Sequence, residues 1–527
     1  MGGGMYGDIE FLSVGLPEDI TKKKWCGDFS GADRLIARYL AGSIPTALRR
    51  RLELERQIMH MLRAEYPHTY RQALAMLQGR IPDFTEAEFH RLEECGELDW
   101  IYVDGSKHYF QGFLDTLLSV DADFAARAGV HKQNRRKQAL GKMDPQRRQQ
   151  AQQADDAAAA REAKKTALLT DTIHYLKEKK SLSLHYHMRA SLRIHEDKFV
   201  PGRVLVHLPI PKNCEQFSGI RIVRTEPETC AVDGEDAPQR TVSFCAELKE
   251  NRTFLVEYEF DTRVCYVEPR AEIVVRALQP ALVHNTQGGL ALTFRKIPGC
   301  PGAMSEKEAR TYLVYGNSAP LVVQDLTEQL PHIRFTPFLR SVAAEAAGDE
   351  INPYLLAKRV YDYVTSKVAY AYVRSYLTIE SIPEYAALCG RGDCGVQALL
   401  FITLCRILGI PARWQSGLNA TPYRVSSHDW AQFYVAPYGW LFADCSFGGS
   451  GYRNGDIEKH EFYFGNLDPF RMVANSEFQK DFYPPKKHLR YDPFDNQSGE
   501  AEYEDRGLSM DDFDRGREVL AIREVEG

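Results

Sequence analysis

The chain has 527 residues, of which 44% are hydrophobic and 26% are charged. This composition is ordinary for globular protein and excludes a chain that is disordered throughout. At roughly 150 residues per domain, the length predicts about three to four structural units. The 66 Lys and Arg residues against 72 Asp and Glu residues give a net charge of −6, which does not favour a nucleic-acid partner.

The sequence shows no signal for secretion or for a membrane. The N-terminal residues lead into polar sequence without the apolar core of a signal peptide. The longest apolar stretch, residues 395–412, contains Gln397, Thr403 and Arg406 and is too short and too polar to cross a bilayer. The eleven cysteines form no disulfide framework and are predicted to be reduced. We therefore expect a cytoplasmic protein with no membrane partner.

Residues 1–130 are predicted to form a mainly helical accessory domain. Apolar residues recur at spacings of three and four over 48–62 and 70–77, and an Asp-Gly pair between β-forming residues at 101–110 predicts a hairpin. No motif here carries chemistry, so the domain is expected to bind protein partners. Residues 131–180 are rich in Gln, Arg and Ala, which favours a solvated helical linker over a nucleic-acid-binding arm.

Residues 181–285 are predicted to form an antiparallel β-sandwich. Apolar and polar residues alternate strictly over 182–194, the pattern of a half-buried strand. Four shorter alternating segments follow, separated by turn residues, and such a series of short strands is typical of a sandwich. His185 and His187 share the polar face of the first strand. A solvated face is favoured there, and a metal-binding pair is the alternative.

Residues 286–485 combine helical and strand patterns and are predicted to form the catalytic α+β domain, with an amphipathic helix from Pro353 to Lys367. Residues 486–527 are expected to be an acidic C-terminal tail that is mobile or loosely docked. From Asp495 onward, 11 acidic residues stand against 4 basic ones. Whether this tail covers the catalytic site stays open at the level of sequence.

A glycine-flanked cysteine begins the most informative helix. Asp393 is a suitable N-cap, and apolar residues at helical spacing follow Cys394 until Gly409 and Pro411 end the helix. In the first turn, free N–H groups and the helix dipole stabilise a thiolate, which predicts a lowered pKa for Cys394. The same N–H groups face a developing oxyanion. Cys394 is therefore the candidate nucleophile, whereas Cys405 on the same helix is predicted to be core.

A cysteine nucleophile needs a base, and the base needs an orienting partner. His428 lies in a predicted strand over 427–435, and Asp444 ends the strand that returns after the turn at 437–439. An odd-length loop or a bulge places the two side chains on one face of this hairpin, whereas an even loop without a bulge separates them. We predict that they share a face.

These residues, in this order, resemble the transglutaminase-like superfamily. Gly-Asp-Cys opens an apolar helix that ends in the run 408–413, His-x-Trp follows in a strand, and an Asp comes shortly after a Gly-Trp pair. The match spans 351–447 and is similar to the bacterial branch of this papain-related group. It implies a papain-like core, in which the cysteine helix packs on an antiparallel sheet, and a triad of Cys394, His428 and Asp444.

The resemblance implies cysteine-dependent acyl transfer or hydrolysis on protein or peptide amides through a thioester, with no cofactor and no metal. Protease, amidase, deamidase and transglutaminase reactions share this triad, so hydrolysis and transamidation both stay open. A catalytically inactive scaffold that binds protein partners is the alternative, although the presence of all three residues argues against it.

The resemblance also points to supporting residues. Members of the family supply an oxyanion donor from upstream of the cysteine, for which Tyr370 and Tyr372 are candidates, and Trp430 is predicted to wall the site. Asp429 departs from the family pattern, because a small residue usually follows the histidine.

Two further cysteines stand close to the triad in the sequence. Cys389 and Cys445 are alternatives as resolving thiols of a redox switch, with buried core cysteines favoured. A zinc site is the least favoured alternative, because the chain has no C-x-x-C pair. Its ligands would be Cys389, Cys394, His428 and Cys445.

Overall fold

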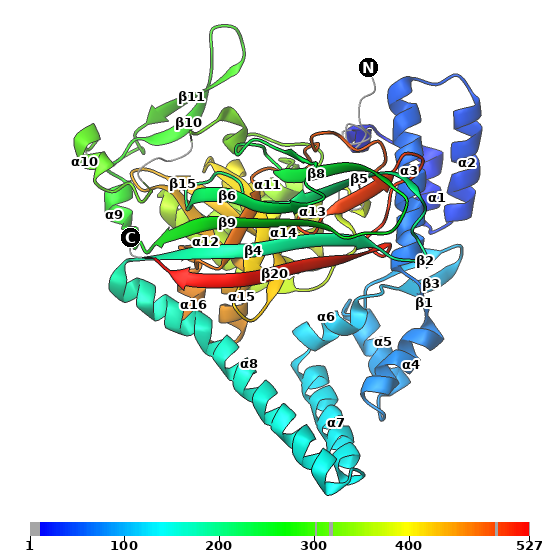
Figure 1. Cartoon of the computed structure of the whole chain (residues 1–527). Coiled ribbons are helices and arrows are strands. Elements are labelled where there is room, and N and C mark those ends of the chain that lie inside the picture. The colour runs from blue at the N-terminus through cyan, green and yellow to red at the C-terminus, as the bar shows by residue number, and fades with distance from the viewer. Residues whose placement is uncertain (1–10, 301–302, 316–319, 491–493, 526–527) are drawn as a thin grey trace.

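A computed structural model describes residues 11–300, 303–315, 320–490 and 494–525. It is a multidomain α+β structure with an N-terminal helical domain, a β-sandwich and a core of helices packed on a five-stranded antiparallel sheet (Figure 1). This is the fold class that the sequence predicts. Within the described ranges, no helix combines the length and apolar character that crossing a bilayer requires.

The N-terminal domain has two small hydrophobic cores, one among its first three helices and one among the next three. The predicted hairpin is present as two paired strands, with a third short strand beside them. The elements are α1 (Glu18–Trp25), α2 (Phe29–Ala41), α3 (Thr46–Glu65), β1 (His68–Thr69), α4 (Tyr70–Arg80), α5 (Glu86–Glu94), β2 (Trp100–Val103), β3 (Ser106–Tyr109) and α6 (Phe113–Val120).

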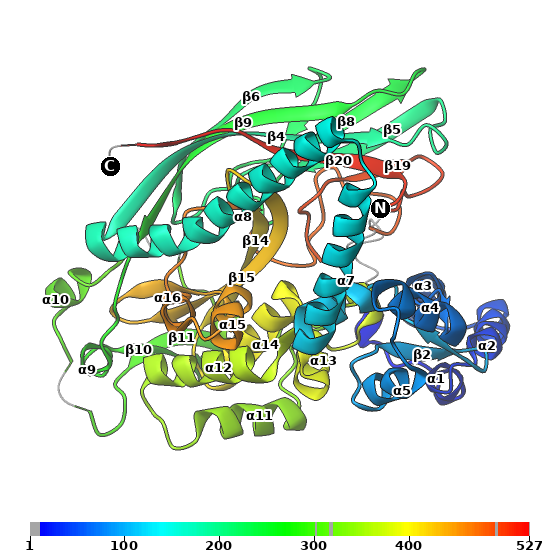
Figure 2. The same cartoon turned by 90° about the horizontal axis from the view of Figure 1, so that it is seen from below.

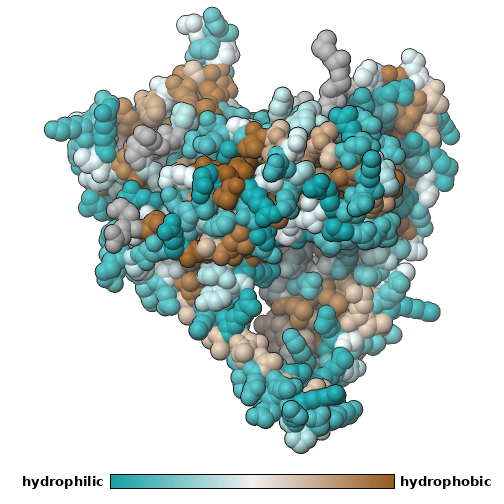
Figure 3. Space-filling model, in the orientation of Figure 1, coloured by the Kyte–Doolittle hydropathy of each residue, from teal (hydrophilic) through white to brown (hydrophobic). Residues whose placement is uncertain are grey.

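Two polar helices, α7 (Ala122–Gly141) and α8 (Pro145–Lys179), join this domain to the sandwich. They meet at an apex that projects from the body in Figure 1, and in Figure 2, seen from below, both helices cross in front of the body. The surface of this apex is largely hydrophilic in Figure 3. The side chain of Asp144 caps α8, and Arg136 pairs with Asp155 across the two helices at 2.9 Å. The helical pattern predicted for this region is therefore present.

The sandwich consists of two four-stranded antiparallel sheets, in the orders β20-β4-β9-β6 and β19-β5-β8-β7. The alternation read from the sequence is confirmed in the first strand, where Leu184, Tyr186 and Met188 are buried and the residues between them are half-buried. The strands are β4 (Ser181–Ile194), β5 (Gly202–Pro209), β6 (Phe217–Glu226), β7 (Ala231–Val232), β8 (Thr241–Leu248), β9 (Phe254–Cys265), β19 (Glu500–Tyr503) and β20 (Phe513–Glu524).

The C-terminal region is not a mobile acidic tail. β19 pairs with β5, and β20 pairs with β4 from Phe513 to Glu524. The acidic residues are accommodated because basic groups elsewhere in the chain meet them. Buried Glu500, for example, binds both Lys486 and Arg490. A count of charges along the segment does not reveal these partners.

The remaining core contains the sheet β17-β16-β15-β14-β18. Its strands are β14 (Ala412–Ala420), β15 (Val425–Val435), β16 (Gly439–Ala443), β17 (Phe464–Gly465) and β18 (Arg471–Asn475), and its helices are α11 (Pro337–Ala347), α12 (Pro353–Lys367), α13 (Ile382–Cys389), α14 (Cys394–Ile407), α15 (Cys445–Arg453) and α16 (Ile457–Phe462). The remaining elements are α9 (Ala271–Val274), β10 (Gln279–His284), β11 (Leu290–Arg295), α10 (Glu306–Arg310), η2 (Val323–Leu326), β12 (Ala369–Tyr370), η3 (Tyr376–Thr378) and β13 (Arg391–Gly392).

The central helix α14 is buried along almost its whole length, which explains its apolar sequence. It packs with α11, α12 and α13 against one face of the five-stranded sheet, where Ala431 and Phe433 join the same core. Trp430 and Met472 instead join the core of the sandwich. The sandwich and the five-stranded sheet therefore share a hydrophobic core.

Candidate active site

Cys394 is the first residue of α14, as the sequence predicts. Asp393 is its N-cap, and Oδ1 of Asp393 accepts a first-turn backbone N–H at 3.1 Å. Gly395 is required by close packing, because a Cβ there would lie 2.3 Å from the hydroxyl oxygen of Tyr376 and 2.9 Å from Oδ2 of Asp429. The Gly-Asp-Cys-Gly run thus caps the helix and admits a tyrosine and a carboxyl group against its first turn.

His428 and Asp444 lie side by side, as predicted. β15 and β16 pair Val435 with Gly439, which leaves the odd-length turn 436–438. Nε2 of His428 and Oδ2 of Asp444 are 2.7 Å apart, and both side chains are buried. The carboxylate assigns the ring hydrogen to Nε2, so Nδ1 keeps the lone pair that can accept a proton.

The carboxylate of Asp444 is held from two further directions. Its Oδ1 accepts the backbone N–H of Phe447 at 2.9 Å, and Nη2 of Arg471 lies 3.0 Å from its Oδ2. Arg471 in turn binds Asp468 at 2.6 Å. Burial opposes ionisation, but His428 and Arg471 hold the pKa of Asp444 below its usual value. Burial lowers the pKa of His428, against the pull of Asp444. The resulting pair is a carboxylate beside a neutral imidazole.

The thiol of Cys394 donates to Oδ2 of Asp429, with 3.2 Å between the sulfur and the oxygen. Among the described residues, no hydrogen bond joins Cys394 to His428. Successive side chains of a strand point to opposite sides, so Asp429 faces the first turn of α14 while His428 stacks on Trp430, with 5.9 Å between the ring centroids. The structure therefore forms two pairs, Cys394 with Asp429 and His428 with Asp444, on opposite sides of β15. It does not bring His428 to the sulfur, as the predicted triad of Cys394, His428 and Asp444 requires.

Three carboxyl groups gather at the start of α14. Burial raises the pKa values of Asp393 and Asp495 to about 6, and burial together with these two acids raises the pKa of Asp429 well above its usual value. Desolvation, followed by the charges of Asp429 and Asp393, also raises the pKa of the Cys394 thiol. The sequence predicts the opposite direction, because the helix dipole is visible in it and the neighbouring carboxyl groups are not.

The predicted supporting residues take different places. Tyr370 pairs with Gly392 in the two-stranded β12–β13 ladder just before the nucleophile. Burial and, after it, the charge of Cys394 raise the pKa of Tyr370. Tyr372 is 50% exposed, and its ring lies edge-on to that of Tyr370. Trp430 is fully buried behind His428, and its indole N–H donates to Gln415 at 2.8 Å. Its indole is therefore already committed to another acceptor.

Several residues of the site carry no signal in the motif. Tyr376 donates to Asp393, Arg471 binds Asp444, and Asp495 and Gln497 reach the site from the C-terminal region. The one hint in the sequence is Asp429. A carboxyl group in place of a small residue next to a buried histidine needs a partner, and these distant residues supply it.

The alternatives based on other cysteines and histidines find little support in the geometry. Cys389 is exposed at the end of α13, so the prediction that it is a buried core cysteine is wrong. Cys445 is buried at the start of α15, and Cys405 is a core residue as predicted. The described residues contain no group of three or more His, Cys, Asp or Glu side chains arranged to hold a metal ion. His185 binds Asp261 at 2.7 Å and His187 lies 3.5 Å from Glu257, so each pairs with a carboxylate across the sheet.

A cavity of about 840 Å³ lies between the sandwich and the five-stranded sheet. Gln415, Arg413 and Gln432 form part of its wall, and buried Lys212 lies at its edge. Because Gln415 accepts the indole hydrogen of Trp430, the wall of this cavity is linked through one ring to His428.

Residues 340–445 match the family model of the transglutaminase-like superfamily. The matched range includes Cys394, His428, Asp444 and Cys445. No match is found among curated proteins.

Several solved structures are similar to the chain. A “Putative Cysteine Protease” from Cytophaga hutchinsonii is 13% identical, with 66% of this chain and 92% of that chain covered and a TM-score of 0.39. The periplasmic domain of TgpA from Pseudomonas aeruginosa is 10% identical, with 55% and 95% covered and a TM-score of 0.25.

Proposed function

Starting from the transglutaminase-like domain at residues 340–445, we propose that this protein is a cysteine enzyme that transfers or hydrolyses acyl groups of protein or peptide amides. Cys394 is the nucleophile, His428 the base and Asp444 its orienting partner. The observation that carries the proposal is the 2.7 Å bond between Nε2 of His428 and Asp444. It leaves Nδ1 as the basic atom, on the residue that precedes Asp429 in β15 and points to the other side of the strand.

Because Asp429 and His428 lie on opposite sides of β15, the first chemical step requires a rearrangement of this strand that brings Nδ1 of His428 to the thiol in place of Asp429. The proton then passes from sulfur to Nδ1, and the thiolate attacks the amide carbonyl carbon to form a tetrahedral oxyanion. The oxyanion accepts hydrogen bonds from first-turn N–H groups of α14, with Tyr370 as the side-chain candidate and Tyr372 as the second. His428 protonates the departing nitrogen, the C–N bond breaks, and a thioester remains on Cys394.

The second half of the reaction resolves the thioester. Water or a primary amine attacks the carbonyl carbon while His428 takes its proton, the C–S bond breaks, and the sulfur recovers a proton. With water the product is an acid, as in a protease, amidase or deamidase. With an amine the product is a new amide, as in a transglutaminase. The acceptor that reaches the thioester decides between the two outcomes.

The test is trapping of the acyl-enzyme. The protein is incubated with an activated ester of a glutamine-containing peptide, and the mass of Cys394 peptides is measured after rapid acid quenching. We expect an acyl adduct on Cys394 that is absent in Cys394→Ala, strongly reduced in His428→Ala and retained in the matched control Cys405→Ala. Addition of a dansylated primary amine then separates transamidation from hydrolysis. Absence of the adduct in the unmodified protein contradicts the proposal.

An inactive scaffold that binds protein partners is the second candidate. The hydrogen bond from Cys394 to Asp429 and the raised pKa of the thiol favour it, because both keep the sulfur uncharged. A scaffold gives no acyl adduct, and it binds partners equally well with Cys394 or Ala at this position. The accessory helices of the N-terminal domain are then the candidate partner-binding surface.

A further inference from the structure

A segment of the C-terminal region, residues 494–498, lies against the start of α14 and is called the strap here. Gln497 donates through Nε2 to the backbone carbonyl of His428 at 3.1 Å and to Oδ1 of Asp429. Nδ2 of Asn475 donates to the carbonyl of Asn496 at 3.1 Å. The strap therefore holds the backbone of His428 and the side chain of Asp429, although it lies outside the matched residues 340–445.

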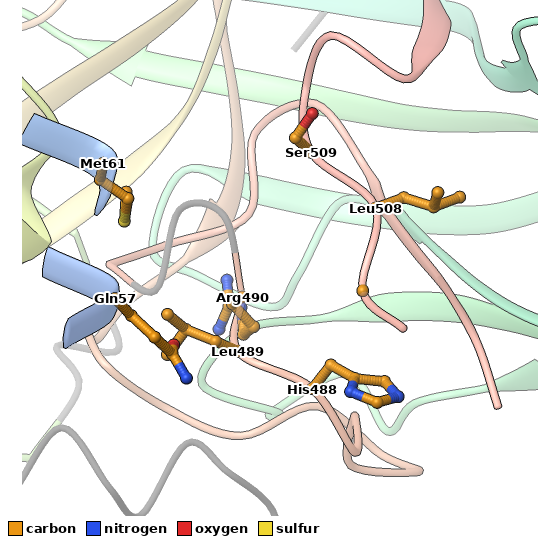
Figure 4. Close-up of a pocket in the computed structure, with 8 residues that line it drawn as sticks. Gln57, Met61, His488, Leu489, Arg490, Leu508 and Ser509 are labelled. Carbon is orange, nitrogen blue, oxygen red and sulfur yellow. The ribbon is translucent and has the colours of Figure 1, made fainter. Parts of the chain in front are cut away.

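The strap is itself held firmly. Nη2 of Arg490 donates to the carbonyl of Asp495 at 2.9 Å, and the same guanidinium binds Glu500 at 2.6 Å and Gln239 at 2.8 Å. Arg490 lines a cavity of about 290 Å³ between the C-terminal region and α3 (Figure 4). The strap thus enters the site from a buried anchor and leaves it in β19.

Asp495 forms a carboxyl pair with Asp429. The two side chains hydrogen-bond to one another, both residues are buried, and Asp495 also accepts from the hydroxyl of Ser416. Two carboxyl groups in direct contact cannot both ionise readily. Ionisation of either member of the pair places a negative charge beside the sulfur.

Other groups also face this pair. The charge of Asp393, the N-cap of α14, raises the pKa of Asp429, whereas the hydrogen bond from the Cys394 thiol lowers it. Tyr376 of η3 donates to Asp393 and lowers the pKa of that carboxyl group. Glu500 in β19 raises the pKa of Asp495, and Arg490 is the opposing cation. The guanidinium of Arg490 is already bound to Glu500.

We propose that Asp429 is a further residue of the reacting centre, which accepts the thiol hydrogen of Cys394 in the resting state and is held in that position by Asp495 and Gln497 of the strap. The inference rests on the proposed function and describes the resting state of the same site. In this state the thiol is hydrogen-bonded to a carboxyl group and is a poor nucleophile. Transfer of the hydrogen to His428 requires that Asp429 releases the thiol and that β15 rearranges to bring His428 to it.

The prediction concerns the reactivity of one thiol. Cys394 keeps partial solvent exposure, so iodoacetamide can report on it. Replacing Asp429 by Asn keeps the shape of the side chain and an acceptor for Gln497 while removing the charge. Since an adjacent like charge shifts a pKa by about one unit or more, we expect alkylation of Cys394 at pH 7 to be about tenfold faster in Asp429→Asn.

The experiment measures alkylation rates by peptide mass spectrometry across pH 6 to 10, with circular dichroism and thermal melting to establish folding. Asp233→Asn is the matched control, because Asp233 is a buried acid of the sandwich bonded to Thr241, and it is expected to leave the Cys394 rate unchanged. Gln497→Ala serves as a second variant without loss of charge, with an expected increase of about threefold. Folded variants that show no increase in either case overturn the proposal.

The double variant His428→Ala/Asp429→Asn separates this inference from the proposed function. If both hold, the fast alkylation of Asp429→Asn falls back when His428 is removed. If Asp429 restrains the thiol but His428 is not the base, alkylation of Cys394 is as fast in the double variant as in Asp429→Asn, and the acyl-enzyme test fails. If the acyl-enzyme forms normally while Asp429→Asn reacts no faster, the inference fails and the proposed function stands.

Discussion

Arg471 places Nη2 3.0 Å from the same carboxylate oxygen of Asp444 that binds Nε2 of His428. The guanidinium comes from β18, stands over the rings of Trp430 and Phe447, and also binds Asp468. Asp444 is therefore fixed by a cation on one side and by the imidazole on the other. This arrangement keeps the acid ionised in a place where burial alone would protonate it.

Replacing Arg471 by Met is expected to impair both stability and activity. Removing one member of a buried ion pair costs about 3–5 kcal/mol, because its partners stay buried without a counter-charge. The pKa of Asp444 rises when the cation is lost, so His428 loses its fixed orientation. Thermal melting measures the first effect and the rate of acyl-enzyme formation the second. Arg310→Met, at an exposed position paired only with Glu306, is the control and is expected to change neither.

Gly395→Ala is expected to destabilise the protein by about 1–3 kcal/mol, because the new methyl group overlaps the Tyr376 hydroxyl at 2.3 Å. Gly79→Ala is a matched control, since Gly79 lies in α4 with no atom within 4 Å of a Cβ. That change is expected to stabilise by up to about 1 kcal/mol. Urea unfolding measures both. If the double variant Gly395→Ala/Tyr376→Phe recovers part of the lost free energy of unfolding, the loss is due to overlap with the Tyr376 hydroxyl. If it recovers none, this explanation is wrong.

Glu65 is expected to make stability depend on pH. Its Oε1 accepts the backbone N–H of Ser375 at 2.9 Å, Oε2 has no partner, and burial raises its pKa to about 7. The folded state therefore keeps a proton that the unfolded state releases above pH 4.5. The stabilisation is complete below that pH and declines as the pH rises through about 7.

Melting temperatures between pH 5 and pH 8 test this expectation. They are expected to fall more steeply in the unmodified protein than in Glu65→Gln. Glu53→Gln, at a half-exposed position of the same helix, is expected to follow the unmodified protein. Parallel curves for all three proteins exclude Glu65 as the source.

Arg374→Met is expected to loosen the segment that leads into the site. Arg374 reaches the hydroxyl of Tyr66 at 3.4 Å, Tyr66 donates to Asp99 at 2.8 Å, and Leu377 belongs to the first core of the N-terminal domain. Amide exchange over 369–378 is expected to accelerate and acyl-enzyme formation to slow. Arg374→Lys retains the charge and is expected to recover part of both. Unchanged exchange in a folded Arg374→Met protein excludes the positioning role.

Removal of residues from Phe513 onward is expected to abolish cooperative unfolding. β20 pairs with β4 over nearly its full length, and Phe513 is buried in the sandwich core. Loss of the strand exposes the edge of β4 and opens the core. Glu518→Ala, which removes only an exposed pair with Arg189, is expected to shift stability by no more than about 0.5 kcal/mol. A truncated chain that melts with the same midpoint contradicts the structure of this edge.

Much of this fold is accessible from local patterns. The alternation over 182–194 and the cap, apolar run and terminating glycine around α14 are short-range signals, and the structure contains both elements where they are predicted. The hairpin that brings His428 to Asp444 follows from strand periodicity and one turn length. These features depend on residues close in sequence, which is why one sequence suffices to find them.

The surroundings of the sulfur depend on residues far away in the chain. Asp495 and Gln497 reach Asp429 from the C-terminal region, and Arg471 reaches Asp444 from a separate strand. Nothing in a count of acids distinguishes buried Asp495 from exposed acids further along the chain, such as Glu504 and Asp505. For the same reason, the direction of the Cys394 pKa cannot be read from its position at a helix start.

The order in which the ribosome makes these parts has a consequence. α14 and the hairpin of His428 are synthesised before Asp495, Gln497 and β20. If the chain folds during synthesis, the sulfur of Cys394 is exposed until Asp495 and Gln497 have been made. The edge of β4 is likewise unpaired until β20 has been made. During that interval the thiol of Cys394 is accessible to oxidants, and the unpaired edge of β4 is accessible to molecular chaperones.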